Sequence, residues 1–283
     1  MVQIKNEVLT VEINPFGAEL YSIKNSQGYE YLWQGNPDVW SGRAPVLFPI
    51  VGGLIDDEFI YDGKAYKLDK HGFARLSDFE VELVEDNEAV FLLKNNDELR
   101  KQYPFEFEFR VIFVLNGNKL EVEYKVNNID NKDIFFSFGA HEAYSCPGGL
   151  NGYYVEFEKQ EALSRYFVTG NFINGEKAPL PMEGNKLYMK DEFFEEDAII
   201  LPDIASKKVW VKSTNNAHSV EIDYTGFKNL LIWTKPNAEY LCIEPWDGIP
   251  DYVGFDKMIE NKKDIITLSE GNEYSLIHTI KFD

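Results

Sequence analysis

The sequence predicts an all-β fold built from antiparallel strands. Residues 105–111 and 120–126 alternate between apolar and polar side chains, which is typical of strands that bury one face, and turn residues at 116–118 separate them. Asp62-Gly63 lies between two more alternating segments and is the strongest two-residue hairpin signal in the chain. No segment has the periodicity of a long amphipathic helix. The expected core is therefore a meander of paired strands.

The other strands follow in order along the chain. Alternation or short apolar runs predict them at 8–13, 18–24, 29–33, 58–61, 64–68, 79–85, 89–94, 134–138, 199–201, 209–213, 219–224, 230–233, 241–243, 264–268 and 274–281. Residues 44–53 form an apolar run with two prolines and two final glycines, as expected for an edge or bulged strand beside a cavity. Residues 95–102 fit one short helical turn. Because no linker or repeat interrupts the pattern, residues 1–283 are expected to form one domain.

The composition favours a large core and a neutral ligand. Of the 283 residues, 44% are hydrophobic and 15% aromatic, and the formal net charge is −20. So acidic a chain has no electrostatic footprint for nucleic acid or an anionic membrane. No run approaches the roughly 20 apolar residues of a membrane span, and no signal-peptide pattern is present, so a cytoplasmic location is expected. Cys146 and Cys242 lack metal-binding or disulfide spacing and are expected to be free thiols.

The stretch from Leu241 to Gly248 places a carboxylate where a buried strand is expected to end. Pro245 has no N–H for a sheet ladder, so the strand should stop there and leave Glu244 at the rim of the sheet. Partial desolvation raises a carboxyl pKa and makes the group a usable base near neutral pH. Trp246 offers a flat apolar face suited to the C–H groups of a sugar ring. The alternative interpretation is a strand end with a capped turn.

Two of the four histidines stand where an apolar strand gives way to small residues. His71 precedes a glycine and His141 follows Gly139-Ala140, so backbone at both places can approach a ligand closely. His218 and His278 fit a solvated turn and strand packing. Any single histidine is more often structural. Both histidines at strand ends, together with Glu244 and with Asp197 at the start of another strand, predict a polar cluster in a concavity of the sheet.

General acid–base catalysis on a neutral polyol is the chemistry that these residues fit best, since it needs only a carboxylate, one or two histidines and an aromatic face. Metal-dependent hydrolysis would call for histidine pairs at helical spacing or a tight ligand cluster, and the spacing along the chain suggests neither. A Ser-His-Asp hydrolase would need an exposed nucleophile, and no G-x-S-x-G or similar elbow is present.

Four motifs in sequence order resemble the aldose 1-epimerase (galactose mutarotase) family, and within it the bacterial galactose-mutarotase-related subgroup. The resemblance covers nearly the whole chain and rests on residues 43–52, 70–75, 138–141 and 242–248. It implies an antiparallel β-supersandwich with a small-molecule sugar bound in an open cleft, no cofactor and no metal. The chain is expected to be a monomer or a homodimer, since exposed strand edges permit a dimer without predicting one.

The resemblance also implies roles for individual residues. Glu244 matches the general base that takes the proton of the anomeric hydroxyl, and His141 matches the general acid at the ring oxygen. His71 matches the histidine that positions the sugar, and Asp197 matches an aspartate that binds sugar hydroxyls. The implied reaction opens the hemiacetal, lets the aldehyde rotate and recloses the ring. A bell-shaped pH profile with limbs from Glu244 and His141 is expected.

Two positions depart from the family pattern. Related sequences usually carry an arginine where this chain has Gly53, so Arg43 or Arg75 is expected to hold the sugar hydroxyls instead. The motif His-Pro reads His141-Glu142 here, and a Glu142 carboxylate facing the cleft would raise the pKa of the histidine. Two alternatives stay open: a hexose-phosphate mutarotase, which predicts Lys/Arg near the cleft, and a non-catalytic carbohydrate-binding or sensing domain.

Overall fold

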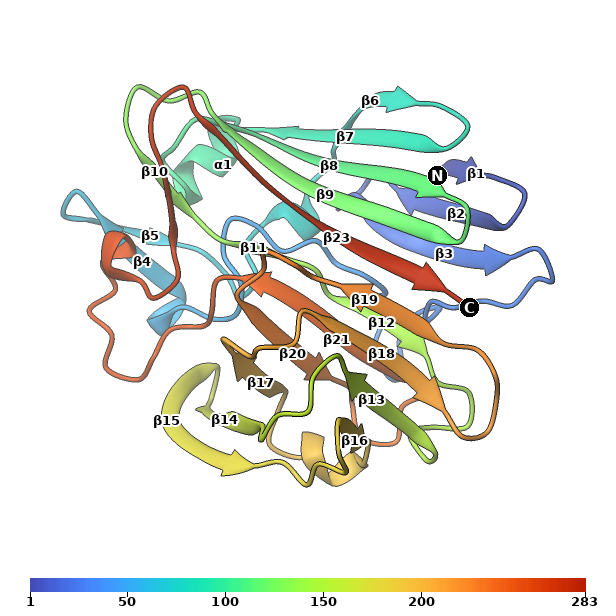
Figure 1. The fold of residues 1–283 in the computed structure, drawn as a ribbon. Coiled ribbons are helices and arrows are strands. Elements are labelled where there is room, and N and C mark those ends of the chain that lie inside the picture. The colour runs from blue at the N-terminus through green and yellow to red at the C-terminus, as the bar shows by residue number, and fades with distance from the viewer.

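The computed structural model describes residues 1–283 and consists almost entirely of antiparallel strands (Figure 1). The larger sheet has nine strands. From one edge to the other these are β16 (Lys186–Tyr188), β13 (Tyr153–Phe157), β18 (Lys208–Ser213), β19 (Val220–Asp223), β23 (Glu273–Phe282), β9 (Lys119–Asn128), β8 (Phe107–Asn116), β7 (Glu88–Lys94) and β6 (Glu80–Val84). The nearly all-β, antiparallel architecture is therefore confirmed.

The predicted meander at 105–126, with its turn at 116–118, is confirmed. Strands β8 and β9 pair continuously from Phe107↔Asn128 to Asn116↔Lys119. Alternate side chains of both strands are buried, as a period of two requires for a sheet with one face on the core. The buried residues join a hydrophobic cluster of 67 side chains.

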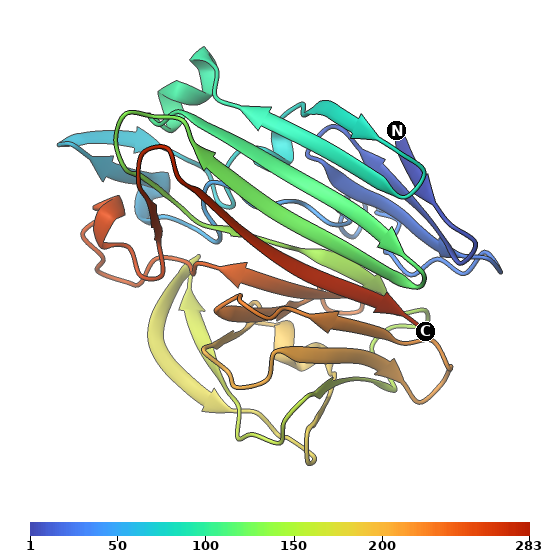
Figure 2. The same ribbon diagram turned by 45° about the horizontal axis from the view of Figure 1, so that its top comes forward.

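The second sheet has seven strands and carries the residues of interest. Its order is β11 (Phe138–Gly139), β21 (Tyr240–Asp247), β20 (Asn229–Trp233), β17 (Ile199–Pro202), β14 (Ser164–Thr169) and β15 (Phe172–Pro179), with β12 (Glu142–Ser145) also paired to β21. The β14–β15 hairpin, yellow in both views, lies at the opposite end of the molecule from β6 and β7 (Figures 1 and 2).

Small elements complete the fold. Three more sheets contain β1 (Val2–Lys5), β2 (Leu9–Asn14) and β3 (Glu19–Asn25); β4 (Glu58–Tyr61) and β5 (Lys64–Lys67); and β10 (Ile134–Phe136) and β22 (Ile266–Leu268). The predicted helical turn is α1 (Asp97–Gln102), and the Asn96 side chain caps it by accepting from two backbone N–H groups. Four short 3-10 turns are η1 (Ile55–Asp57), η2 (Ala74–Leu76), η3 (Asp191–Phe194) and η4 (Ile259–Asn261). None of these helices has the length and apolar character needed to cross a bilayer.

The expectation that a strand ends at Pro245 is wrong. Strand β21 runs through this proline to Asp247, and every one of its residues is buried. The register places Ala140 opposite Pro245. The Ala140 N–H donates to the Pro245 carbonyl at 3.0 Å. The Ala140 carbonyl, which lacks its ladder donor, accepts from the Trp246 indole N–H at 3.1 Å. A side chain thus replaces the missing backbone donor, and Glu244 lies inside the sheet rather than at its rim.

Candidate functional site

A cavity of about 470 Å³ lies over the β20–β21 part of the second sheet, a volume suited to a small molecule. Its walls come from the loop at 40–45, the turn at 70–75, the β14–β15 hairpin and the start of β17. Six residues predicted from the sequence line it: His71, Arg75, His141, Asp197, Glu244 and Trp246. The chain therefore gathers at one place side chains that are up to 175 positions apart, counted from 71 to 246.

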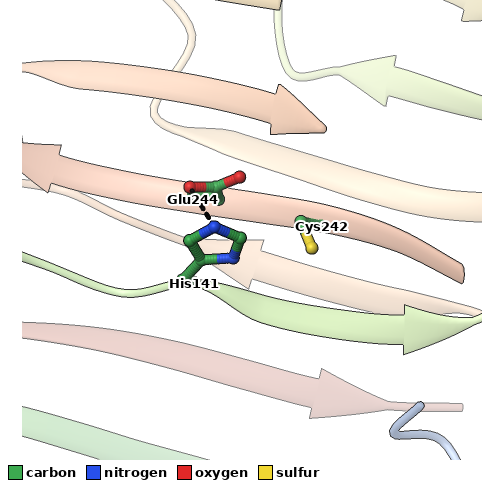
Figure 3. A group of neighbouring side chains, drawn as sticks. All are labelled: His141, Cys242 and Glu244. Atoms are coloured by element: carbon green, nitrogen blue, oxygen red, sulfur yellow. Dashed lines mark ion pairs between the residues drawn. The ribbon is translucent and has the colours of Figure 1, made fainter. Parts of the chain in front are cut away.

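Glu244 and His141 face each other across a break in the sheet. The pairing of β21 with β11 and β12 places His141 opposite Glu244, at the residues where the ladder is interrupted. Nε2 of His141 lies 3.4 Å from Oε2 of Glu244 (Figure 3). Both side chains are buried, Glu244 with 2% of its surface exposed. At this separation one bound oxygen atom can relay a proton between the carboxyl group and the imidazole.

Burial drives the pKa values of this pair in opposite directions. Desolvation raises the pKa of Glu244 well above its usual range, with Asp197 and Glu142 adding to the rise and Lys70 opposing it. Desolvation is also the largest cause that lowers the pKa of His141 to about 3, and the charges of Lys70 and Arg75 lower it further against a backbone hydrogen bond. Both shifts favour the uncharged forms. Burial thus opposes a charge on either member of the pair.

His71 is held in one tautomer by the backbone. Its own backbone adopts a left-handed conformation, with φ of 70°. The Gly52 N–H donates to Nδ1 at 3.2 Å, and the His71 N–H donates to the Gly52 carbonyl. Desolvation, followed by the charges of His141, Lys70 and Arg75, lowers the pKa of His71 well below its usual value. Since Nδ1 of a neutral imidazole accepts here, Nε2 carries the proton and is the hydrogen-bond donor.

Three tryptophans form the apolar walls of the cavity. The ring of Trp40 stacks on His141 at 5.3 Å between centroids, and Trp233 meets the same imidazole edge-on at 5.6 Å. Trp246 is fixed by the hydrogen bond to Ala140 and by close contact with Gly139, where a Cβ atom would lie 2.4 Å from Cδ1 of the indole. These rings cover part of the His141 imidazole and offer flat surfaces to a ligand.

Asp197 reaches the cavity from an unusual backbone conformation. Its φ is 130°, a value that residues other than glycine rarely adopt. The buried guanidinium of Arg165 holds this turn by donating to the carbonyls of Phe193, Asp197 and Ala198. Oδ1 of Asp197 accepts from the Ala198 N–H at 2.8 Å. Arg165 therefore acts as a positioning residue for Asp197.

Two cations line the cavity without a carboxylate partner. Nζ of Lys70 donates to Oδ1 of Asn171 at 3.0 Å. Nη2 of Arg75 donates to the Lys70 carbonyl at 3.2 Å, and Nε of Arg75 is buried without a hydrogen-bond partner. Neither side chain takes part in an ion pair, although the chain has 48 carboxylates. Their charge is available to a ligand in this cavity.

Arg43 does not line the cavity, and the expectation that it binds the ligand is not supported by its position. Its guanidinium lies 3.5 Å above the centroid of the Tyr21 ring and donates to the Tyr21 carbonyl and to Oε1 of Gln34. These contacts fix the loop that carries Trp40. Of the two arginines proposed from the sequence, only Arg75 contributes to the cavity.

The two departures from the family pattern have structural explanations. Glu142 points to the opposite face of β12 from His141, and its Oε1 lies 2.9 Å from Nε2 of the buried His278. The Glu142 carboxylate is thus behind the sheet, so the condition for its raising the histidine pKa is not met. At Gly53, a Cβ atom would lie 2.7 Å from Cβ of Asn171. The tip of the β14–β15 hairpin occupies the place where an arginine side chain would begin.

Several residues of the cavity escaped the sequence analysis: Glu19, Trp40, Lys70, Asn171 and Trp233. Lys70 adjoins the predicted His71 and could have been found from that position. Asn171 lies in a hairpin whose strands show weak alternation, so nothing in the sequence pointed to it. Cys242, His141 and Glu244 each bring a metal-ligating atom within 4.8 Å of the others, although their spacing along the chain gave no such indication.

Comparison with known proteins identifies relatives over the full length. The model of the aldose 1-epimerase family matches residues 1–281. The plasmid-encoded protein LacX of Lactococcus lactis is 32% identical over 278 residues, which cover 93% of each chain. A galactose mutarotase related enzyme from Lactobacillus acidophilus has 34% identity and a TM-score of 0.95, covering 99% of this chain and 96% of the other. A galactose mutarotase-like protein from Lactobacillus casei has 32% identity and a TM-score of 0.95 over both complete chains.

Proposed function

Because the chain belongs to the aldose 1-epimerase family, we propose that it interconverts the α and β anomers of a hexose by general acid–base catalysis. The observation that carries this proposal is the buried contact of 3.4 Å between His141 and Glu244 in a cavity of sugar size. Ring opening needs one group that takes a proton from the anomeric hydroxyl and one that gives a proton to the ring oxygen. The pair supplies both groups side by side.

One transferable proton on the pair is enough for the cycle. Its transfer from the Glu244 carboxyl to the His141 imidazole creates a carboxylate base and an imidazolium acid. Glu244 then takes the proton of the anomeric hydroxyl while His141 protonates the ring oxygen, and the bond between C1 and the ring oxygen breaks. The aldehyde rotates about C1–C2. Attack of the freed hydroxyl on the other face of the aldehyde reverses the two proton transfers and restores the pair, so the reaction needs no cofactor.

The other cavity residues orient the sugar in this proposal. Nε2–H of His71 donates a hydrogen bond to the ring oxygen of the sugar. The Gly52 contact, which fixes the tautomer of His71, supports this role. Asp197 accepts hydrogen bonds from sugar hydroxyls, and Arg75 donates to them. The indole of Trp246 packs against the C–H face of the ring. Orientation of this kind lowers the entropic part of the barrier.

Polarimetry tests the proposal directly. Freshly dissolved α-D-galactose and α-D-glucose are followed with the purified protein and with its Glu244→Gln variant at equal concentration. A decay of optical rotation that is faster than in buffer and disappears in the variant supports the epimerase. A decay no faster than buffer, combined with sugar binding in calorimetry, overturns the proposal in favour of the non-catalytic carbohydrate-binding domain.

A phosphorylated hexose is the second candidate substrate, favoured by the unpaired charges of Lys70 and Arg75. Both cations lie in the cavity, and a phosphate group would give them the anionic partner that the protein does not supply. The same polarimetric assay with α-D-glucose 6-phosphate decides between the substrates. A Lys70→Met variant should lose much more of kcat/KM for the phosphate ester than for the free sugar. Equal losses for both substrates contradict this candidate.

A further inference from the structure

A sulfur, a nitrogen and an oxygen ligand meet at the edge of the cavity, where the buried Cys242 lies beside two residues of its lining, His141 and Glu244. One potential ligand atom from each of His141, Cys242 and Glu244 lies within 4.8 Å of the other two (Figure 3). Cys242 and Glu244 are two positions apart on β21, so both project from the same face of that strand. His141 approaches from the facing segment between β11 and β12. Three ligands of different chemistry thus converge on one point.

These atoms are not committed to other partners in the protein. The thiol of Cys242 makes no hydrogen bond and lies against a small apolar cluster with Ala143, Ala238 and Tyr240. Nε2 of His141 is near Glu244, itself a proposed ligand, and Nδ1 of the same buried ring has no partner. The Glu244 carboxyl contacts only His141 among charged or hydrogen-bonding side chains. Buried polar atoms without partners are rare and usually indicate a ligand or a functional role.

The spacing fits a tetrahedral metal ion with small adjustments. Zinc binds imidazole nitrogen and carboxylate oxygen at roughly 2.0–2.2 Å, which separates two such ligands by about 3.3 Å at a tetrahedral angle. His141 and Glu244 already lie 3.4 Å apart. The zinc–sulfur bond is longer, about 2.3 Å, and the Cys242 sulfur lies within 4.8 Å of the other two ligand atoms. His141 and Glu244 also line the cavity, so a ligand there can approach an ion bound to them.

We propose that His141, Cys242 and Glu244 form a binding site for a thiophilic divalent metal ion of the Zn²⁺ type. A thiolate, a carboxylate and a neutral imidazole exactly balance the two positive charges of such an ion, which favours binding in a buried place. The bound ion occupies both members of the proton-transfer pair. It therefore inhibits, rather than assists, the proposed epimerase; this inhibition rests on the proposed function, whereas metal binding does not.

A cadmium titration tests the site without any assay of activity. The purified protein is freed of metal with a chelator and titrated with Cd²⁺ while the ultraviolet charge-transfer band of a cadmium–thiolate bond is recorded. The wild-type protein should bind one ion with this band. The Cys242→Ala variant should lose the band, and Cys146→Ala should keep it, because Cys146 is buried elsewhere without other ligands nearby. Zn²⁺ should displace the Cd²⁺.

Two further variants separate a site of three ligands from a single reactive thiol. His141→Gln and Glu244→Gln retain Cys242 and should each weaken metal binding by about 100-fold or more, beyond the effect usual for residues that only support a ligand. Thermal unfolding checks that each variant is folded. Absence of the band in wild-type protein, equal loss in both cysteine variants, or unchanged affinity in both glutamine variants overturns the site. These outcomes do not depend on whether polarimetry detects an epimerase.

Discussion

His141 and Glu244 approach within 3.4 Å at the only position where β21 and its neighbours β11 and β12 lose their ladder. Pro245 causes this interruption because it cannot donate to Ala140. Directly opposite residues of antiparallel strands have neighbouring side chains, and the register places His141 opposite Glu244. Strand pairing thus brings the imidazole beside the carboxyl group, next to the interruption at Pro245.

Glu244→Gln should lower the epimerase rate by about 10²–10⁴-fold, because the amide cannot take or give the proton. Glu142→Gln is the matched control: this carboxylate is also buried on the same sheet but contacts His278 instead of the cavity. Polarimetry on the two variants should show a large loss in the first and a rate near wild type in the second. Similar losses in two folded variants would contradict the assignment.

The pH profile should lack a limb near the ordinary histidine value of about 6.5. The reaction needs one proton on the pair. On the acid side the pair gains a second proton when His141 is protonated, and the pKa of His141 is lowered to about 3. On the alkaline side the pair loses its single proton when Glu244 is deprotonated, and the pKa of Glu244 is raised well above the usual range. The acid limb of the bell-shaped rate profile is thus expected at lower pH, and the alkaline limb at higher pH, than the ordinary pKa values of the two groups suggest. A limb of kcat/KM near pH 6.5 that is absent in His141→Gln would contradict the shifts.

The stability of the protein should also depend on Glu244. Its folded-state pKa is raised, so this carboxyl stabilises the fold below its unfolded pKa, and that contribution is lost as pH rises toward and through the folded value. Glu244→Gln removes the ionisable group and should raise the Tm, with a difference from wild type that grows between acidic and mildly alkaline pH. Calorimetry at several pH values measures this. A Tm difference between variant and wild type that shrinks with rising pH would contradict a raised pKa of Glu244.

Substitution of the two arginines proposed from the sequence should affect different properties: KM for Arg75 and stability for Arg43. Arg75→Met removes an unpaired cation from the cavity and should raise KM by about tenfold, as loss of one charged hydrogen bond predicts. Arg43→Met should leave KM near wild type but lower stability by about 1–2 kcal/mol, since the lost contacts with Tyr21 and Gln34 are structural. Steady-state kinetics and denaturant titration of both variants provide the comparison.

Because Gly53 and Asn171 are crowded together, a substitution at Asn171 should restore stability that a substitution at Gly53 removes. Gly53→Ala should destabilise the protein by about 1–3 kcal/mol, because its Cβ would lie 2.7 Å from Cβ of Asn171. Asn171→Gly in the same chain removes the clash, so the double variant should recover much of the loss. A double-mutant cycle from denaturant unfolding measures this coupling. Additive effects of the two substitutions would show that the hairpin does not restrict position 53.

Local sequence patterns could predict the strands but not every consequence of their pairing. The period of two identified β8 and β9 with their register, because one buried face determines it. The same logic failed at Pro245, because the donor that replaces its N–H is the indole of Trp246. Likewise, the direction of Glu142 follows from strand alternation once His141 faces the cavity, but the buried partner His278 lies 136 positions away.

The candidate site was predictable to the extent that its residues carried a motif. His71, His141, Glu244 and Trp246 reached the cavity as expected. Arg43 belongs to the same kind of motif, yet its side chain turns toward Tyr21, a rotamer choice that no local pattern encodes. Lys70 and Asn171 meet through a contact between segments 101 positions apart. Such long-range contacts depend on how the hairpin packs over the sheet, which spacing alone does not determine.

Strand β21 has neighbours on both sides and no exposed residue, so its amide hydrogens should exchange with solvent only as fast as the whole molecule unfolds. Glu244 is therefore carried by one of the slowest-exchanging segments of the chain. The β14–β15 hairpin has mainly solvent-exposed or half-exposed positions and sits at the end of the same sheet. Deuterium uptake should thus divide the cavity into a slowly exchanging floor and a wall that exchanges on a faster timescale.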